Sequence, residues 1–304
     1  MSDSKPEETA LSRTGNGGIQ HHNARTYASS ESYILPSDEA ERQRLDHQHG
    51  LFKRNFENRL FMAPVALKAA DRVLDSGTGA GSWLLDFAGE VPDTVAIYGI
   101  DISPRLFPAN PPANVHLSTQ SVTQLPADWS ATFALVNQRH LVGGLTATAW
   151  KAALAEIYRV LVPGGWYDLR PMSLMNCDST HMDYQQGPAT FKMLKIVDAV
   201  FRSVGALPDA VYHLRGWLEE AGFVNVDTQM RRLPLCHGAP GQDTFNSYVV
   251  HAALKTPVMK AGGFGLVSSD EEYDQLALAT QEELWSTENA AVQNFMIYAQ
   301  KPAV

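Results

Sequence analysis

The apolar positions between residues 73 and 170 follow two patterns in alternation. Apolar residues at helical spacing begin at Trp83 and fill the segment from Trp150 to Leu161. Short apolar runs, which are typical of buried strands, lie at 73–75, 95–101, 115–118, 133–137 and 166–170. Strands and helices in alternation, with short connections, predict an α/β protein with an open, doubly wound sheet.

The residues before this stretch have different patterns. Residues 1–28 are polar and aperiodic, which predicts a disordered tail. Residues 29–70 contain a predicted helix that Ser37 caps and whose apolar positions recur at helical intervals as far as Phe61. We expect this segment either to act as a lid, with Tyr33 closing a pocket, or only to cover an edge of the sheet.

The second half of the chain completes the predicted domain. Ser269 and Glu272 form a capping box that opens a helix. A polar loop is expected at 173–190, further helices at 191–204, 214–221 and 244–254, and strands from 222 and at 294–299. We therefore expect a single domain over 29–304, made of the lid at 29–70, a cofactor-binding core at 71–172, and substrate-side helices with the last two strands at 173–304.

The charge of the chain argues against a polyanionic partner. Its 304 residues include 24 Lys and Arg against 33 Asp and Glu, for a formal net charge of −9, and the basic residues do not cluster. This charge argues against nucleic acid or an anionic membrane as the main partner, and no apolar run approaches a membrane span. Cys177 and Cys236 have neither metal-ligand nor disulfide spacing, so we expect no metal and a cytoplasmic location. A small molecule is the expected partner, and the sequence leaves open whether the chain forms a homodimer.

The glycine-rich loop after the first predicted strand carries the clearest chemical signal. Gly77, Gly79 and Gly81 allow a tight turn, and the helix that follows directs its first N–H groups at the loop. A dinucleotide fingerprint would have its third glycine where this chain has Ser82. The carboxylate of Asp75, just before the loop, would repel a pyrophosphate, whereas it suits a ligand with a positive charge.

A second acid supports the same kind of ligand. Asp101 ends the second predicted strand, where a carboxylate can accept hydrogen bonds from both hydroxyls of a ribose. The loop with its two acids resembles motif I of class I S-adenosylmethionine methyltransferases. That cofactor carries a sulfonium and an ammonium and no phosphate. The resemblance therefore implies S-adenosylmethionine as the cofactor.

The same resemblance implies the other cofactor contacts. In these enzymes the turn after the third strand holds the adenine, usually with an acid before an apolar residue. Here Ser121 stands in the place of the acid, and Val122 can stack on the ring. Polar residues at the carboxyl end of the fourth strand should face the cofactor or the acceptor. The expected contacts are Tyr33, Asp75, Ser76, Gly77, Thr78, Gly79, Trp83, Asp101, Ile102, Ser121, Val122, Asn137 and Gln138.

Several separated motifs resemble those of the LaeA-like fungal methyltransferases. They lie at 33–39, 44–49, 75–83, 101–103, 138–141, 158–166 and 298–302. The resemblance implies a Rossmann-like, seven-stranded sheet with a reversed last strand and a helical N-terminal lid. The resemblance also implies that the protein is either a tailoring enzyme of secondary metabolism or a regulatory protein. The chain departs from the family after the fifth strand, where an acid is usual and this chain has Arg170-Pro171, and at Ala134, where the family usually has an acid.

The residues for the chemistry are less specific than those for the cofactor. Methyl transfer depends on in-line positioning, and it needs a base only if the acceptor starts protonated. His140, after the fourth strand, is the first candidate for that base, and a histidine that only hydrogen-bonds the backbone beneath the pocket is the alternative. The expected substrate contacts are Arg170, Met172, His181 and Tyr184.

Three functions stay open on the sequence. The first is an S-adenosylmethionine-dependent methyltransferase that acts on an oxygen or nitrogen of a small-molecule secondary metabolite. The second is an enzyme of the same fold that uses the sulfonium charge to promote a cyclisation or rearrangement without methyl transfer. The third is a regulatory protein that binds the cofactor and a protein partner. Stoichiometric formation of S-adenosylhomocysteine would distinguish the first function from the other two.

Overall fold

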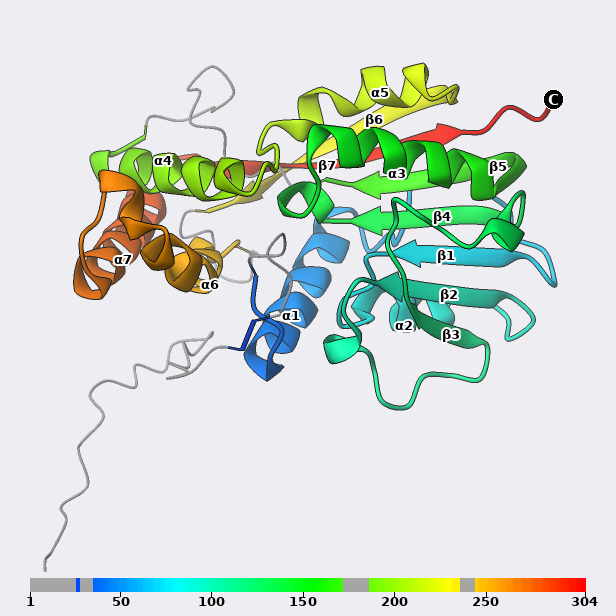
Figure 1. Ribbon diagram of the computed structural model, residues 1–304, viewed down its shortest axis with the longest axis horizontal. Helices are drawn as coiled ribbons and strands as arrows, with labels where there is room; N and C mark the ends of the chain where they lie inside the picture. The colour runs from blue at the N-terminus through cyan, green and yellow to red at the C-terminus, as the bar shows by residue number, and fades with distance from the viewer. Residues whose placement is uncertain (1–25, 28–34, 172–185, 236–243) are drawn as a thin grey trace, which may run out of the picture.

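The fold is organised around one seven-stranded sheet (Figure 1). The structure is a computed structural model, and it describes residues 26–27, 35–171, 186–235 and 244–304. The strand order is β3-β2-β1-β4-β5-β7-β6, with β7 antiparallel to both of its neighbours. The strands are β1 (Arg72–Ser76), β2 (Ala96–Asp101), β3 (Val115–Thr119), β4 (Phe133–Arg139), β5 (Leu161–Arg170), β6 (Val224–Pro234) and β7 (Ala291–Gln300). The predicted doubly wound sheet with a reversed last strand is confirmed.

The helices lie on both faces of the sheet and beyond one of its ends (Figure 1). They are α1 (Glu39–Asn55), α2 (Ser82–Ala88), α3 (Ala147–Val160), α4 (Pro188–Ser203), α5 (Leu214–Glu220), α6 (Ser247–Lys260) and α7 (Asp270–Ser286). Short 3-10 turns occur at Pro104–Leu106, Ala127–Trp129, Leu141–Gly143, Ala210–Tyr212 and Gly262–Gly265. The helices α4, α6 and α7 gather on the side toward which the parallel strands point, so they enclose the edge of the sheet where ligands bind in such folds.

Alternation along β1 shows how the sheet supplies two cores. Leu74 faces a large apolar cluster that includes residues of α3, α4, α5 and α6. Val73, its neighbour, faces a smaller cluster built with Trp83 and Phe87 of α2. Successive side chains of a strand point to opposite faces, and a strand that is buried on both faces reads as a continuous apolar run. This explains why these strands could be recognised from sequence.

Several element boundaries differ from the prediction. The helix α1 ends at Asn55, because Glu57 and Asn58 adopt positive φ angles of 52° and 62° that a right-handed helix cannot continue through. Its cap is Asp38, whose carboxylate accepts a hydrogen bond from the N–H of Glu41, and not Ser37. The strand β5 already begins at Leu161, whereas a strand was expected only at 166–170.

One half of the predicted capping box of α7 forms. Ser269 accepts from the N–H of Glu272 at 3.1 Å, as predicted. The carboxylate of Glu272, however, accepts from the N–H and the hydroxyl of Ser268 and not from the N–H of Ser269.

Candidate active site

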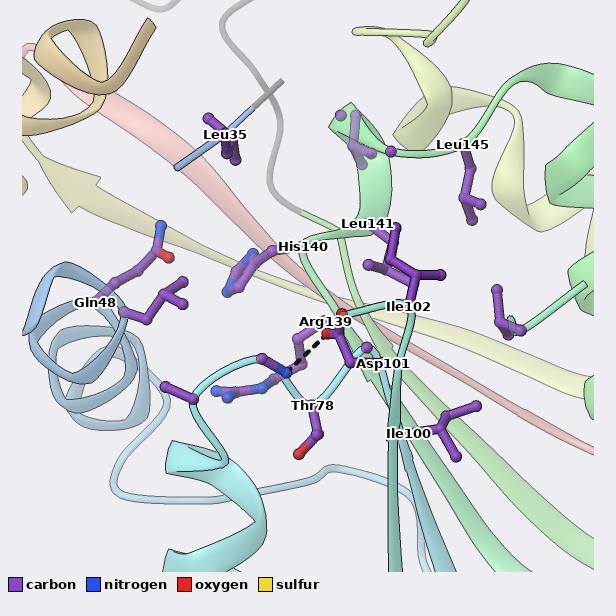
Figure 2. A pocket seen from close by; sticks show the side chains of 18 of the residues that line it. Leu35, Gln48, Thr78, Ile100, Asp101, Ile102, Arg139, His140, Leu141 and Leu145 are labelled. Carbon is purple, nitrogen blue, oxygen red and sulfur yellow. Dashed lines mark hydrogen bonds between the residues drawn. The ribbon is translucent and has the colours of Figure 1, made fainter. Parts of the chain in front are cut away.

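A cavity of about 360 Å³ lies at the carboxyl ends of the parallel strands. Figure 2 shows side chains that line it, drawn from α1, the glycine loop and the ends of β2 and β4. The turns after β3 and β4 and the helices α4 and α6 complete its wall. Elements that are far apart in the sequence therefore meet at this cavity, as the sheet topology predicts.

The glycine loop brings bare backbone to the cavity. Gly77 and Gly79 line it and adopt positive φ angles of 72° and 52°, which a residue with a Cβ rarely adopts. The N–H groups of Gly77 and Thr78 donate to the carbonyl of Ile100 at 2.9 and 2.8 Å, and these bonds fix the loop against β2. A Cβ at Gly79 would lie 3.6 Å from the side chain of Leu45, so α1 approaches the loop closely.

Asp101 presents an oriented carboxylate at the end of β2. Its Oδ2 accepts from the N–H of Gly79 at 3.0 Å, the bond drawn in Figure 2, and its Oδ1 accepts from the N–H of Ser103 at 3.1 Å. Burial raises the pKa of Asp101, and the backbone hydrogen bonds oppose that rise. Each oxygen keeps lone-pair capacity toward the cavity, because a carboxylate can accept about four hydrogen bonds.

Asp75 lies beneath the cavity and does not line it. Its carboxylate accepts from the hydroxyl of Thr78 and from the side-chain amide of Asn137, both at 2.6 Å. Burial raises its pKa, while the guanidinium of Arg139 and these two hydrogen bonds oppose the rise. Asp75 thus braces the loop against β4, and its charge can act on a ligand only through space.

Four other residues predicted as cofactor contacts lie in the protein interior and do not line the cavity, Asn137 among them. The hydroxyl of Ser76 donates to the side chain of Gln138 at 3.3 Å, and both residues are fully buried outside the cavity lining. The indole of Trp83 donates to the carbonyl of Leu60 at 2.9 Å and stacks on Phe87. We correct the prediction for Trp83, because the first turn of α2 directs this side chain into the core of the sheet.

Three of the expected cofactor contacts line the cavity near the turn after β3, and their role toward an adenine stays a prediction. Ile102, Ser121 and Val122 all line the cavity, next to the turn after β3. The side chain of Ile102 is 48% exposed, which is high for an isoleucine that follows a buried strand. The hydroxyl of Ser121 bonds with that of Thr123 at 2.8 Å. An apolar slot with few polar groups is what a flat aromatic base requires.

His140 lines the cavity but does not have the surroundings of a base. It adopts φ 57° and ψ 26°, and its ring lies 5.0 Å from that of Phe52. Both ring nitrogens are buried and have no hydrogen-bond partner among the described residues. Burial, followed by the charges of Arg139 and Arg170, lowers the pKa of His140 well below 6.5. The ring is therefore neutral at physiological pH, and its role as a base stays a prediction.

Arg170, the expected substrate contact, is also placed away from the cavity. Its side chain is buried, with Nη2 donating to the sulfur of Met296 at 3.0 Å and the guanidinium 5.1 Å from the ring of Phe56. It makes no ion pair with an acid in the described part of the chain, and its role as a substrate contact stays a prediction. The remaining predicted contacts, Tyr33, Met172, His181 and Tyr184, lie outside the described residues.

Two cavity residues for which no role was predicted lie together in the structure. Arg139 at the end of β4 donates to His49 of α1 at 2.8 Å, and both residues line the cavity. Arg139 belongs to a polar run whose general position was predicted, but its partner lies 90 residues away in the chain. The sequence signal that could have found this pair is that both residues are polar and lie on segments that face the ligand edge of the sheet.

The helix α1 lies over the cavity. Leu35, Arg44, Leu45 and Gln48 all contribute to its wall. Side-chain bonds tie this helix to α2, among them Asp46 to Ser82 at 2.6 Å. In the described part of residues 29–70, α1 therefore forms part of the cavity wall, and its role as a lid stays a prediction.

The site fits the cofactor that the sequence implies. A glycine loop without Cβ atoms, an oriented carboxylate beside it and an apolar slot beyond it suit a nucleoside with a cationic chain. Among the described residues no group of three or more His, Cys, Asp or Glu side chains could hold a metal ion. No helix in the described ranges is both long and apolar enough to cross a membrane. Fold and site together define a class I, Rossmann-like enzyme with a place for S-adenosylmethionine.

Comparison with known proteins gives the family. A family model described as "Methyltransferase domain" matches residues 73–165. The N-methyltransferase tcpN of Claviceps purpurea is 31% identical over 265 residues, which cover 83% of this chain and 91% of tcpN. The N-methyltransferase sirN of Leptosphaeria maculans is 33% identical over 206 residues, covering 67% of this chain and 70% of sirN. The chain belongs to this family of fungal methyltransferases and is an S-adenosylmethionine-dependent methyltransferase.

A solved structure has a similar fold. The phosphoethanolamine N-methyltransferase 2 of Haemonchus contortus, in complex with phosphomonomethylethanolamine and S-adenosylhomocysteine, aligns with a TM-score of 0.49 at 15% identity. The alignment covers 90% of this chain and 55% of that one.

Proposed function

We propose that this enzyme methylates a nitrogen atom of an uncharged, largely apolar small molecule of fungal secondary metabolism. Nitrogen is favoured because relatives such as tcpN and sirN are named N-methyltransferases. The acceptor class is inferred from the cavity wall beyond the glycine loop. The LaeA-like affiliation and a cytoplasmic location are parts of the same proposal.

The apolar wall of the acceptor end is the observation that carries this proposal. The side chains there come from α4, α6, the turn after β4 and the segment before α1, and they are Leu35, Val142, Leu145, Phe201, Val250 and Ala253. Asp101, at the ribose end, is the only carboxylate among the described residues of the lining. A cationic acceptor would find no counter-charge at the apolar end, whereas an uncharged one loses little on leaving water.

In such a reaction the residues of this chain would bind the cofactor and position the acceptor. Bound S-adenosylmethionine supplies an electrophilic methyl group on a sulfonium. Asp101 would accept from the ribose hydroxyls, and the glycine loop would let the cofactor lie directly on backbone. The apolar wall would exclude water and hold the acceptor in line with the methyl, and positioning of this kind can supply much of a rate enhancement. The neutral ring of His140 would orient the acceptor as a hydrogen-bonding group.

The test is a transfer assay with the purified protein. It is incubated with S-adenosylmethionine and a panel of apolar amines, amides and phenols, and products are identified by mass spectrometry. The proposal expects N-methylated product together with one equivalent of S-adenosylhomocysteine. Methylation only of phenols would overturn the choice of nitrogen. A rearranged product without S-adenosylhomocysteine would support the non-methylating alternative, and cofactor binding without turnover would support a regulatory role.

A further inference from the structure

Arg139 and Asp101 flank the glycine loop at the same level of the sheet. Register pairs Ser76 of β1 with Ile100 of β2 and with Gln138 of β4, so Asp101 and Arg139 both stand one residue further on. They are separated by two strand spacings of about 4.8 Å each. With adenine on the β3 side and ribose at Asp101, the opposite end of the cofactor, which bears its carboxylate, falls on the side of β4.

Arg139 is a half-buried cation that makes no ion pair with the described residues. Its one hydrogen bond among the described residues is the donation from Nη1 to Nδ1 of His49. The nearby carboxylate of Asp75 is already taken up by Thr78 and Asn137. Burial lowers the pKa of Arg139 to about 10, so the group remains charged at neutral pH. Taking a guanidinium partly out of water costs free energy, and an anion that binds to it would offset that cost.

His49 holds this guanidinium in place and connects it to α1. Because arginine can only donate, Nδ1 of His49 is the acceptor and Nε2 carries the proton. That Nε2 lies 2.9 Å from Oδ2 of Asp86 in α2, and Asp86 also accepts from Lys53 at 2.8 Å. Figure 2 shows Arg139 extending from the end of β4 toward the glycine loop, where its free N–H groups border the cavity.

We propose that Arg139 is the anion-binding subsite that receives the carboxylate of S-adenosylmethionine, and that His49 positions it. A planar guanidinium suits a carboxylate because it can donate two parallel hydrogen bonds. This inference depends on the cofactor and not on the acceptor, so it is independent of the proposed N-methylation.

The test compares two ligands by calorimetry in the absence of an acceptor. The ligands are S-adenosylhomocysteine and its decarboxylated analogue, which lacks only the carboxylate. The wild-type protein should prefer S-adenosylhomocysteine by about 10- to 100-fold, the range of one or more charged hydrogen bonds. Arg139→Met should weaken S-adenosylhomocysteine by a similar factor, change the affinity for the analogue by less than about threefold, and so remove the preference.

Two further measurements keep the proposal falsifiable. Arg105→Met removes an exposed guanidinium from the turn at Pro104–Leu106 and should leave both affinities unchanged. Arg139→Lys, which keeps the charge but not the planar fork, should retain part of the preference. The proposal is overturned if the wild-type protein binds both ligands equally, a result that needs no variant. It is also overturned if Arg139→Met binds S-adenosylhomocysteine with the original preference.

Discussion

Single residues at the ligand edge differ in whether their role follows from the sequence. The roles of Gly77, Gly79 and Asp101 could be predicted, because there are few other reasons for glycine or aspartate to follow a buried strand. Trp83 could not, since a glycine loop followed by a helix does not tell which side of the first turn faces the ligand. Arg139 needs its partner His49, which only the folded chain places beside it.

Asp101 gives the simplest prediction at this scale. Asp101→Asn keeps the shape and one acceptor oxygen but removes the charge that would receive the ribose hydroxyls. We expect S-adenosylhomocysteine to bind about 10-fold more weakly or worse, because a charged hydrogen bond contributes about 1.5–3 kcal/mol. Calorimetry measures the change, and Asp128→Asn, at an exposed position, is the control. Unchanged affinity would remove Asp101 from the site.

His140 makes a prediction about the pH dependence of turnover. Since burial holds its pKa well below 6.5, the ring is already neutral at that pH and neither gains nor loses a proton there. We expect kcat to show no ionisation near pH 6.5 that depends on this residue. Profiles of the wild type and of His140→Asn provide the check. An ionisation near that pH that disappears in the variant would instead identify His140 as the base.

The elements of the core could be predicted better than the elements around it. The strands of the parallel half are buried on both faces, so their apolar runs are continuous. The strand β6 is the edge of the sheet and is largely exposed, and its sequence pattern gave only its beginning. The end of α1 depends on two residues with positive φ angles, Glu57 and Asn58, whose types do not require that conformation.

The attachment of α1 should be sensitive to acid. Burial, followed by the charge of Arg139, lowers the pKa of His49 from 6.5 to about 4. The charge of Arg170 also lowers this pKa, whereas Asp86 raises it. The folded state thus resists a proton that the unfolded state accepts, so stability is full above pH 6.5 and falls as the pH drops from 6.5 toward 4. A protonated ring would also present N–H to the Arg139 donor. The protection factors of the amides in α1, which are exchange rates corrected for the intrinsic effect of pH, should therefore fall over this range.

A matched pair of variants tests this prediction. His49→Gln can still accept from Arg139 and donate to Asp86, but it does not titrate. The protection factors in α1 of this variant should depend less on pH than those of the wild type. His47→Gln changes an exposed histidine of the same helix and should behave as the wild type does. If His49→Gln and the wild type respond to pH alike, His49 is not the acid-sensitive group.

At the scale of the whole molecule, β7 joins two parts of the sheet. It pairs with β5 on one side and with β6 on the other, antiparallel to both. Its register covers Ala291 to Gln300, almost the last residues of the chain. The strand order could be inferred from the family resemblance but not from apolar pattern, because pairing between distant segments leaves no local signal.

Truncation tests the importance of β7. A chain that ends at Asn289 lacks the whole strand and exposes unpaired edges on both β5 and β6. We expect it to be aggregated or to lack a cooperative thermal transition in circular dichroism. Removing only Ala303 and Val304, which are exposed, should change the midpoint little. A truncated chain that melts cooperatively near the wild-type temperature would contradict this view of β7.

The position of β7 also has a consequence for folding. The strands β5 and β6 each pair with β7, which follows both of them in the chain. Until β7 has docked between them, a folding chain exposes two open strand edges, and such edges can pair with other chains.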